Sequence, residues 1–368
     1  MIFYLSVFIF FLLLFFSLRD KAYLPLVALM LLLACLRSST VGSDFPAYVR
    51  LINSGYYDIS LTDVLRWYAS EDFWEDRTYG SGAFREFGFS FLVSFLKFLF
   101  KDPVFILNTL VLLIITIFSI SFYKVLGRKE MVWGLLFYYG TYLFFSSFNT
   151  IRQSLAVSLV FMGACFFFKH RYIGAISLLL SAVTVHSSSL LVLPLFLLYK
   201  VKLPNKVIVY SFVISLVISL FRLRLDFLFV FLPDSFAGND YESNFYKEGL
   251  AQYNVYIHYM SFVFNVYTCY VFYWFYTRSS ESYRYFYNLW YVGILLYILL
   301  MSAVNVGRIS EFFYVFLILA LPLSLIQFRD TESEEYQKAF QLAMVYLIGW
   351  HSYYIFRNWY GIVPYISF

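Results

Sequence analysis

Long apolar stretches separated by short polar turns dominate the chain. A helix of roughly 17–25 apolar residues crosses the hydrocarbon core of a bilayer, so each such stretch predicts a membrane span. The pattern predicts an all-α, polytopic integral membrane protein with about 12 or 13 transmembrane helices in a single domain over residues 1–368. The apolar stretches run over about 1–18, 22–38, 84–100, 103–123, 131–147, 150–168, 172–199, 205–222, 253–276, 285–305, 308–328 and 337–355.

Two segments interrupt this pattern with long polar loops. The first loop, about 39–83, contains seven acidic residues, three arginines and no lysine, and the second, about 223–252, also leans acidic. Loops poor in lysine and arginine belong outside the cytoplasm, so both are expected to be extracytoplasmic. Within the first loop, apolar residues at helical spacing predict a helix over 58–76, with Ser60 and Asp63 able to cap its start.

The charge pattern also predicts an unusual segment next to the first loop. If residues 39–83 lie outside, two full spans at 84–100 and 103–123 would place the basic turn Lys124–Lys129 outside as well. We therefore expect one of these two segments to be re-entrant, which is tolerated where the backbone is buried in protein or lines a wet cavity. A cytoplasmic first loop is the alternative. The stretch 172–199 is too long for one straight span, and its central His186 and following serines predict a break into two short helices.

Composition supports the membrane interpretation and excludes several other classes. The 368 residues are 62% hydrophobic and only 13% charged, whereas soluble domains are about 25% charged. The net charge of +5 lies mostly in short loops, which suits membrane orientation and not nucleic-acid binding. The three cysteines lie in apolar segments and offer no disulfide or metal spacing. Phosphate-binding loops, zinc pairs and serine-hydrolase elbows are absent from the sequence.

The string Ser147–Gln153 lies between two apolar stretches and carries Arg152. An arginine at the centre of a membrane helix costs roughly 2.5–3.5 kcal/mol, so it is retained where it pairs, meets water or binds an anion. Asn149, Arg152 and Gln153 stand at i, i+3 and i+4, which predicts one helical face that presents all three. A plain alternative is that Arg152 reaches the lipid headgroups.

Charged residues also stand at the ends of other apolar stretches. Arg37 and Asp44 bracket a small-residue turn, where they form either a loop salt bridge or a phosphate and sugar site. Glu86 opens the third stretch, where it either caps a helix or acts as a general base. His186 suits proton transfer or a hydrogen-bonded structural role. Arg308 follows a glycine between two late stretches, where it pairs with a neighbouring acid or binds phosphate.

In their order along the chain, these positions resemble the EpsG/Wzy-type family of bacterial polysaccharide polymerases. The string from Phe148 to Ala156 is the closest match. Glu86 is followed by phenylalanine where the family often has proline. The other matching elements are Arg37 with Val41-Gly42-Ser43-Asp44 and Tyr48, Glu86-Phe87-Gly88-Phe89, His186-Ser187-Ser188, and Gly307-Arg308.

The resemblance implies a glycosyltransferase of the bacterial cytoplasmic membrane that needs no cofactor or metal. Its substrates would be undecaprenyl-diphosphate-linked oligosaccharide repeat units on the outer face of the bilayer, joined into O-antigen, capsule or exopolysaccharide. A flippase and a chain-length regulator are the expected protein partners, and no nucleic acid is expected.

The resemblance also assigns roles to individual residues. Either Asp44 or Glu86 would activate the acceptor hydroxyl, with His186 as a further candidate for base or phosphate ligand. The remaining assignments concern binding of the diphosphate, the lipid carrier and the sugars, and they fall on Arg152, Arg37, Arg308, Asn149, Gln153 and Tyr48.

Two other functions compete with polymerisation. A lipid-linked oligosaccharide flippase would use the same arginines, but the spans show no inverted repeat. A membrane O-acyltransferase would need a catalytic histidine, and the sequence near His186 offers no acidic partner.

Overall fold

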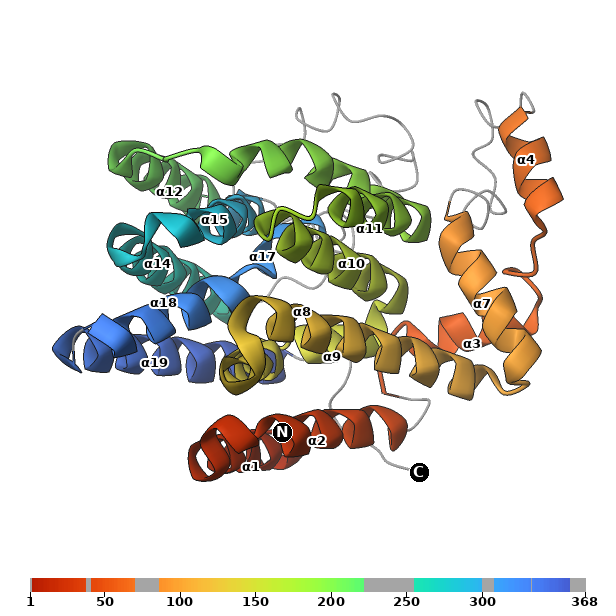
Figure 1. Ribbon diagram of the computed structural model, residues 1–368, viewed down its shortest axis with the longest axis horizontal. Coiled ribbons are helices and arrows are strands. Elements are labelled where there is room, and N and C mark those ends of the chain that lie inside the picture. The colour runs from red at the N-terminus through yellow and green to blue at the C-terminus, as the bar shows by residue number, and fades with distance from the viewer. Residues whose placement is uncertain are drawn as a thin grey trace. The chain divides into compact units, whose positions relative to one another are not determined.

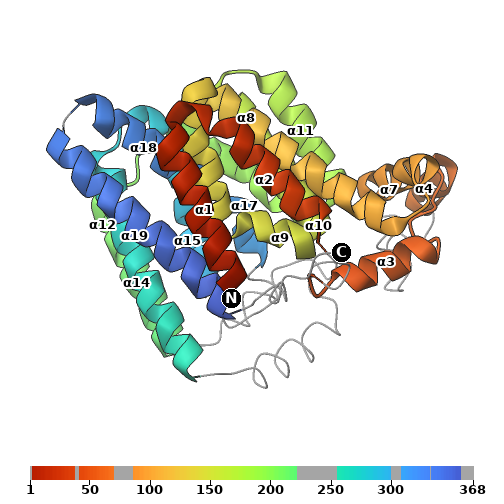
Figure 2. The same ribbon diagram turned by 90° about the horizontal axis from the view of Figure 1, so that it is seen from below.

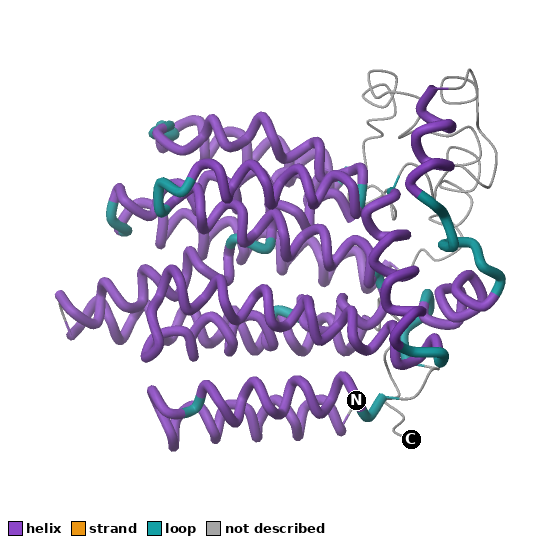
Figure 3. Tube along the Cα trace, turned by 45° about the vertical axis from the view of Figure 1, so that its right-hand side comes forward, coloured by secondary structure: helices purple, strands orange, loops and turns teal. Residues whose placement is uncertain are grey.

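The computed structural model describes residues 2–37, 41–69, 86–221, 255–299, 308–331 and 333–357. Throughout these ranges the chain forms helices and connecting turns without any strand (Figure 3). The all-α, polytopic membrane fold predicted from the apolar pattern is confirmed. The chain packs as two compact units, with residues 1–193 and 349–368 in unit 1 and residues 194–348 in unit 2. The single membrane domain over residues 1–368 stays a prediction.

Unit 1 is organised around α8, which consists of two helical arms joined by a kink at Gly127. Helices α2 and α10 pack against α8, and α11 packs against α10 (Figure 1). Helices α3, α4 and α7 lie together at one end of α8, which Figures 1 and 2 show from two directions. The helices of this unit are α1 (Ile2–Leu18), α2 (Tyr23–Cys35), α3 (Phe45–Asn53), α4 (Leu61–Ala69), α7 (Phe87–Leu99), α8 (Pro103–Gly140), α9 (Leu143–Asn149), α10 (Ile151–Phe168) and α11 (Tyr172–Val185).

Helix breaks in unit 1 differ in part from those predicted. The predicted spans 103–123 and 131–147 are confirmed as two helical arms of α8, which a kink separates and whose second arm ends at Gly140. Its only interruption is Gly127, whose φ of 81° lies in the left-handed region that glycine adopts without a Cβ penalty. A second break follows at Tyr142, where α9 begins. The break predicted at His186 is confirmed, since α11 ends at Val185.

Helix α7 is shorter than the stretch 84–100 predicted from sequence, and its re-entrance stays a prediction. Its 13 residues span about 20 Å at 1.5 Å per residue, whereas the hydrocarbon core is about 30 Å thick. Within the described ranges, four helices are long and apolar enough to cross a membrane, namely Phe3–Lys21, Pro103–Gly140, Ile151–Phe168 and Arg308–Thr331. Four shorter apolar helices accompany them, so the predicted count of about 12 or 13 spans stays a prediction.

The first polar loop contains two short helices, α3 and α4. The predicted cap of α4 is confirmed: Ser60 Oγ accepts from the Asp63 backbone N–H at 3.1 Å, and Asp63 Oδ2 accepts from the Ser60 N–H at 3.1 Å. This reciprocal pair is a capping box, which satisfies the first free donors of a helix. The remainder of the predicted helix, residues 70–76, lies outside the described residues, as does the second predicted loop at 223–252.

Unit 2 contains the later helices of the chain. Helix α15 packs against α12, α14, α17 and α18. Its Gly293 permits close approach to α17, because a Cβ there would lie 2.4 Å from the Tyr314 backbone nitrogen. The boundary between the units falls within two elements, because η2 (Ser187–Lys200) begins in unit 1 and the last residues of α19 (Ser333–Arg357), from Gly349, belong to unit 1. The other elements of unit 2 are α12 (Asn205–Leu220), α14 (Val255–Arg278), α15 (Arg284–Leu299), η5 (Arg308–Ser310), α17 (Glu311–Tyr314) and α18 (Leu317–Thr331).

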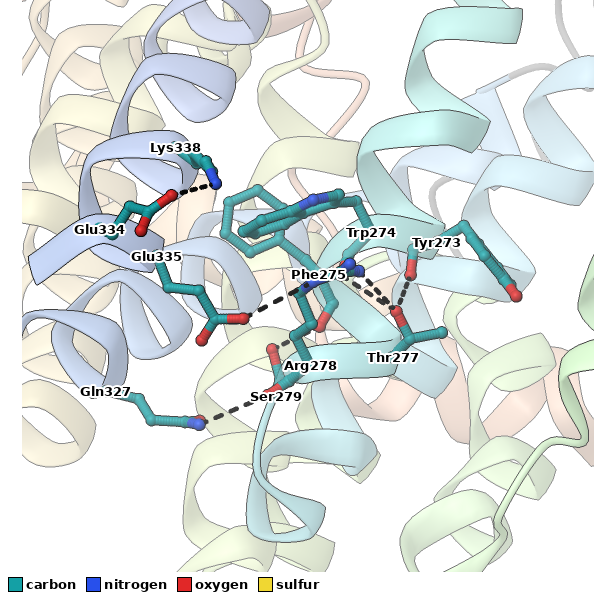
Figure 4. Close-up of polar contacts among 10 residues, drawn as sticks. All are labelled: Tyr273, Trp274, Phe275, Thr277, Arg278, Ser279, Gln327, Glu334, Glu335 and Lys338. Carbon is teal, nitrogen blue, oxygen red and sulfur yellow. Dashed lines mark hydrogen bonds and ion pairs between the residues drawn. The ribbon is translucent and has the colours of Figure 1, made fainter. Parts of the chain in front are cut away.

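Polar side chains join the ends of three helices in unit 2 (Figure 4). The Arg278 guanidinium lies over the Trp274 ring at 4.7 Å and its Nε is 3.8 Å from Glu335 on α19. Gln327 of α18 donates to the Arg278 carbonyl at 3.5 Å. Because α14 ends at Arg278, the Gln327 hydrogen bond satisfies one of the backbone carbonyls that a helix end leaves unpaired.

Candidate functional site

Three of the predicted site residues meet in unit 1. Arg152 Nη1 lies 2.6 Å from Glu86 Oε2, and His186 Nδ1 lies 2.5 Å from Glu86 Oε1. The backbone N–H of Ser187 also donates to Glu86 Oε1 at 3.2 Å. Arginine, carboxylate and imidazole therefore form one charged cluster, which we call the Glu86 cluster (Glu86, Arg152 and His186).

The Glu86 carboxylate serves this cluster and does not cap its own helix. Glu86 stands at the N-cap of α7, as the capping alternative predicted, but its side chain makes no capping hydrogen bond. The Arg152 guanidinium and the hydrogen bonds from His186 and Ser187 together stabilise the ionised form of the Glu86 carboxylate.

The hydrogen bond to an ionised carboxylate fixes the imidazole tautomer. An ionised carboxylate only accepts hydrogen bonds, so His186 Nδ1 carries the hydrogen and donates to Glu86. In the neutral ring, Nε2 then carries the lone pair that takes up a proton. The side chains of His186 and Arg152 are 19% and 29% exposed, whereas Glu86 is 8% exposed. Glu86 is thus more deeply buried than the two side chains that it contacts.

Local packing brings the cluster together. Gly88 lets α7 approach α11 closely, because a Cβ at that position would lie 2.2 Å from Thr184 Oγ1. His186 has an extended backbone that ends α11, and Ser189 Oγ donates to the Ala182 carbonyl in the last turn. Serine side chains often satisfy helix ends in this way. The serines after His186 therefore stabilise the break that places the imidazole beside Glu86.

Tyr48 borders the same cluster from α3. Its phenol interacts with both the guanidinium and the backbone of Arg152. Its ring lies 6.2 Å from the ring of Phe89, which follows Glu86 on α7. The motif residues of α3 and α7 thus face the same arginine.

A second group of motif residues surrounds Asn149. Asn149 Oδ1 accepts from the Asp44 backbone N–H at 2.6 Å and from Ser43 Oγ at 3.0 Å. Gly42, with a φ of 102°, permits this close approach, because a Cβ there would lie 2.6 Å from the Phe148 carbonyl oxygen. The turn that carries Asp44 is therefore fastened to the end of α9 through the Asn149 amide.

Arg37 lies in the same neighbourhood but is fully buried. Its guanidinium is 4.6 Å from the Phe45 ring centroid and 4.4 Å from the Phe148 ring centroid. An arginine between two aromatic rings gains cation–π attraction, which is stronger where water is excluded. The cation is thereby held between α3 and α9.

The predicted single face of Asn149, Arg152 and Gln153 is not found. Helix α9 ends at Asn149 and α10 begins at Ile151, with Thr150 at φ −93° and ψ 53° between them. The Thr150 hydroxyl donates to the Ser146 carbonyl and lies 3.2 Å from Ser154 Oγ. These hydroxyls support the interruption, so Asn149 faces the Ser43–Asp44 turn while Arg152 faces Glu86. Gln153 is buried in α10.

The remaining predicted residue, Arg308, begins η5 in unit 2. The preceding motif residues, Asn305 to Gly307, lie outside the described residues. All the other predicted site residues belong to unit 1. The structure thus forms two groups of predicted site residues. The Glu86 cluster with Tyr48 is the first group. Asp44 and Asn149 form the second group, and Arg37 lies next to it.

Two features of the site were missed by sequence reasoning. His186 does have an acidic partner, Glu86, which stands 100 residues earlier in the chain. Tyr57 also interacts electrostatically with Arg152, although no motif marks it. For the His186–Glu86 pair, the available signal was that both residues stand where an apolar helix begins or ends. For Tyr57 the sequence contains no comparable signal.

Comparison with known proteins places these motifs in one family. No curated protein and no solved structure matches the sequence. A family model matches residues 20–367, a range that holds every residue of the Glu86 cluster, the Asn149 group, Arg37 and Arg308. The resemblance inferred from the motifs is confirmed at the level of the family. The chain is a multi-pass membrane protein that belongs to the EpsG family, a family tied to exopolysaccharide biosynthesis.

Proposed function

We propose that the protein is a polysaccharide polymerase that joins undecaprenyl-diphosphate-linked repeat units on the outer face of the bacterial cytoplasmic membrane. The observation that carries this proposal is the Glu86 cluster. It combines a permanent cation, a carboxylate and an imidazole at the ends of three apolar helices. Transfer of a sugar from a diphosphate needs a group that takes up a proton and a cation for the leaving group.

In the proposed reaction, a hydroxyl of the new repeat unit attacks the anomeric carbon of the growing chain. The new glycosidic C–O bond forms while the C–O bond to the diphosphate breaks. Undecaprenyl diphosphate leaves with the bonding electrons, and the hydroxyl proton passes to His186 Nε2. Fixed cations aimed at the leaving oxygens stabilise the charge that develops there.

The geometry refines the roles inferred from the sequence. The two carboxylate oxygens of Glu86 are committed to Arg152 and His186, so Glu86 is poorly placed to accept the acceptor's proton. We therefore assign proton uptake to His186 and treat Glu86 as a positioning residue that stabilises the imidazolium as it forms. This arrangement follows the logic of a carboxylate that orients a histidine in hydrolases. Asp44 remains the alternative base.

The reaction also requires positive charge to bind the diphosphate leaving group, and arginines supply it. A guanidinium presents five N–H donors in a planar fork, so Arg152 can bind Glu86 through Nη1 and a phosphate oxygen through its remaining donors. Its 29% exposure leaves it accessible to a ligand. Arg37 and Arg308 remain proposed ligands of the diphosphate and lipid carrier.

One observation also favours a second candidate, an O-acyltransferase. The Glu86–His186 hydrogen bond supplies the acidic partner that such a histidine requires. Polymerisation is favoured because an acyltransferase gives no reason for Arg152 to share the same carboxylate. A flippase has no comparable support, although it stays a proposed partner together with a chain-length regulator.

Reconstitution tests the function directly. The purified full chain is placed in liposomes with lipid-diphosphate-linked repeat units from the same cells, and the products are separated by length. A polymerase yields a ladder of increasing length and releases undecaprenyl diphosphate in equal number to the bonds formed. Products that carry an added acyl group without lengthening would support the acyltransferase instead.

The proposed side of the membrane has its own test. Ser54 follows α3 in the lysine-free first loop and is exposed. Ser54→Cys, in a chain whose Cys35, Cys165 and Cys269 are replaced, should react with a membrane-impermeant maleimide in intact spheroplasts. Reaction only after lysis would place the loop and Asp44 in the cytoplasm, which contradicts the proposed outer site.

A further inference from the structure

Three tyrosines from α3 and the turn that follows it gather at Phe89, close to the Glu86 cluster. The Tyr48 ring lies 6.2 Å from the Phe89 ring, and Tyr48, Tyr56 and Tyr57 are all near enough to Arg152 to influence its charge. The Tyr57 ring meets the Phe89 ring edge-on at 5.4 Å, and the Tyr56 ring meets the Tyr57 ring edge-on at 5.1 Å. Edge-to-face contacts of this kind fix the orientation of aromatic rings.

The three rings differ in exposure. Tyr57 is only 2% exposed, whereas Tyr48 and Tyr56 are half-buried. Tyr57 therefore acts as a support, and the two outer tyrosines offer accessible surface. This surface combines apolar ring faces, phenol hydroxyls and one guanidinium within a small region.

The turn that carries Tyr56 and Tyr57 is fastened to α7. Ser94 Oγ donates to the Tyr57 carbonyl at 2.7 Å, and Lys97 Nζ lies 2.5 Å from Asp58. Gly55, with a φ of 77°, closes the turn. Because Glu86 directly precedes α7, the same helix positions both the tyrosines and the Glu86 cluster. A binding surface fixed to a rigid helix loses little freedom when a ligand binds.

We propose that Tyr48 and Tyr56 form a sugar-binding subsite for a pyranose ring of the repeat unit. A pyranose has an apolar face of C–H groups and a polar edge of hydroxyls, which matches tyrosines with an apolar body and a polar tip. The inference rests on the proposed function, because it places this sugar beside the reacting bond. The sugar belongs either to the acceptor repeat unit or to the end of the growing chain.

Binding can be measured without turnover. The probe is the oligosaccharide released by mild acid from the cells' own lipid-linked repeat units. It is titrated against the full chain in nanodiscs, with His186→Ala present in every sample, and followed by saturation-transfer NMR. Tyr56→Leu removes the ring and should weaken binding by at least about tenfold, as expected for a central aromatic contact. Tyr56→Phe keeps the ring and should weaken binding by only a few-fold.

The matched control is Tyr123→Leu, because Tyr123 is a 52% exposed tyrosine on α8. Control binding should equal that of the parent. If Tyr56→Leu and Tyr56→Phe both bind as tightly as the parent, the subsite is wrong, even where polymerisation itself proceeds.

Steady-state kinetics then distinguish the two sources of the sugar. In an otherwise unchanged chain, Tyr56→Leu should raise KM for a soluble acceptor oligosaccharide if the acceptor sugar occupies the subsite. It should raise KM for the lipid-linked donor if the growing chain does. Unchanged KM values for both would overturn the inference. If the wild-type chain forms no polymer but binding still depends on Tyr56, the proposed function fails and the subsite stands.

Discussion

Two arginine–glutamate pairs in this chain have very different settings. In unit 1, Arg152 lies 2.6 Å from Glu86, whose side chain is 8% exposed and also accepts from His186. In unit 2, Arg278 lies 3.8 Å from Glu335, and both side chains are more than 40% exposed. Arg278 also packs over Trp274 and its carbonyl accepts from Gln327 (Figure 4).

The difference separates a structural contact from a candidate site. An exposed ion pair contributes about 0–1 kcal/mol, so the unit 2 pair joins helix ends with little energetic consequence. A buried pair must offset the desolvation of both charges. Removal of one partner leaves the other as an uncompensated buried charge, which is strongly destabilising. The buried pair, with a histidine on the same carboxylate, is therefore the candidate site, and the exposed pair is a structural contact.

The largest effect is expected at His186. His186→Ala removes the proposed proton acceptor and should lower turnover by about 10²–10⁴-fold with little loss of lipid-substrate binding. Glu86→Gln keeps an acceptor for Nδ1 but loses the charge that stabilises the imidazolium, so it should also lower turnover strongly. Rates are measured on purified protein with lipid-diphosphate repeat units.

Glu335→Gln is the matched control and should leave turnover within about twofold of wild type, since its pair is exposed. Asp44→Asn tests the alternative base. If His186→Ala polymerises normally while Asp44→Asn is inactive, the base is Asp44. The Glu86 cluster would then supply only positive charge for the diphosphate.

The second effect concerns the shape of the cation. Arg152→Lys keeps the charge but loses the planar fork, so it cannot bind Glu86 and a phosphate oxygen in the same way. Most polymer should be lost at matched protein level in cells. Arg278→Lys in the exposed pair should produce normal polymer. Full polymer from Arg152→Ala would leave only the explanation that Arg152 reaches the lipid headgroups.

Local features of this fold could be predicted from sequence. The Ser60–Asp63 capping box lies within four consecutive residues, and the break at His186 follows from serines inside an overlong apolar stretch. Family membership followed from the string around Arg152. The boundary between the stretches 131–147 and 150–168 was also predicted, and α9 ends and α10 begins there. The single helical face assigned across this boundary was wrong, because the backbone of Thr150 is not helical.

The long-range part of the site could not be predicted. Glu86 and His186 meet only because Gly88 lets α7 approach Thr184 on α11, a contact that no spacing along the chain encodes. The capping role considered for Glu86 is local chemistry, and it is displaced by stronger interactions with Arg152 and His186. Asn149 was assigned to substrate from its neighbours, yet its amide oxygen is occupied by the Ser43–Asp44 turn.

An intermediate effect is expected at Asn149. Its side-chain oxygen holds the Ser43–Asp44 turn in place, which gives Asn149 a positioning role. Asn149→Asp keeps an acceptor for the Asp44 N–H and Ser43 Oγ, so the turn should stay in place and much activity should remain. Asn149→Ala removes the acceptor and leaves the part-buried Asp44 N–H without this partner, at a cost of up to about 1–3 kcal/mol. Turnover and limited proteolysis of the first loop are measured together. Equal loss in both variants, with the loop intact, would instead assign the amide nitrogen to substrate.

The smallest effect is expected from removal of the unit 2 pair itself. Arg278→Gln with Glu335→Gln leaves two exposed polar side chains, and an ion pair of this exposure contributes about 0–1 kcal/mol. The apparent melting temperature of the purified protein should fall by no more than about 2–4 °C, and the product ladder should be unchanged. Added salt should reduce even this difference, because screening weakens exposed charges. A large loss of polymer at unchanged melting temperature would mean that this end of unit 2 also takes part in the reaction, and the contrast between the two pairs would no longer separate site from scaffold.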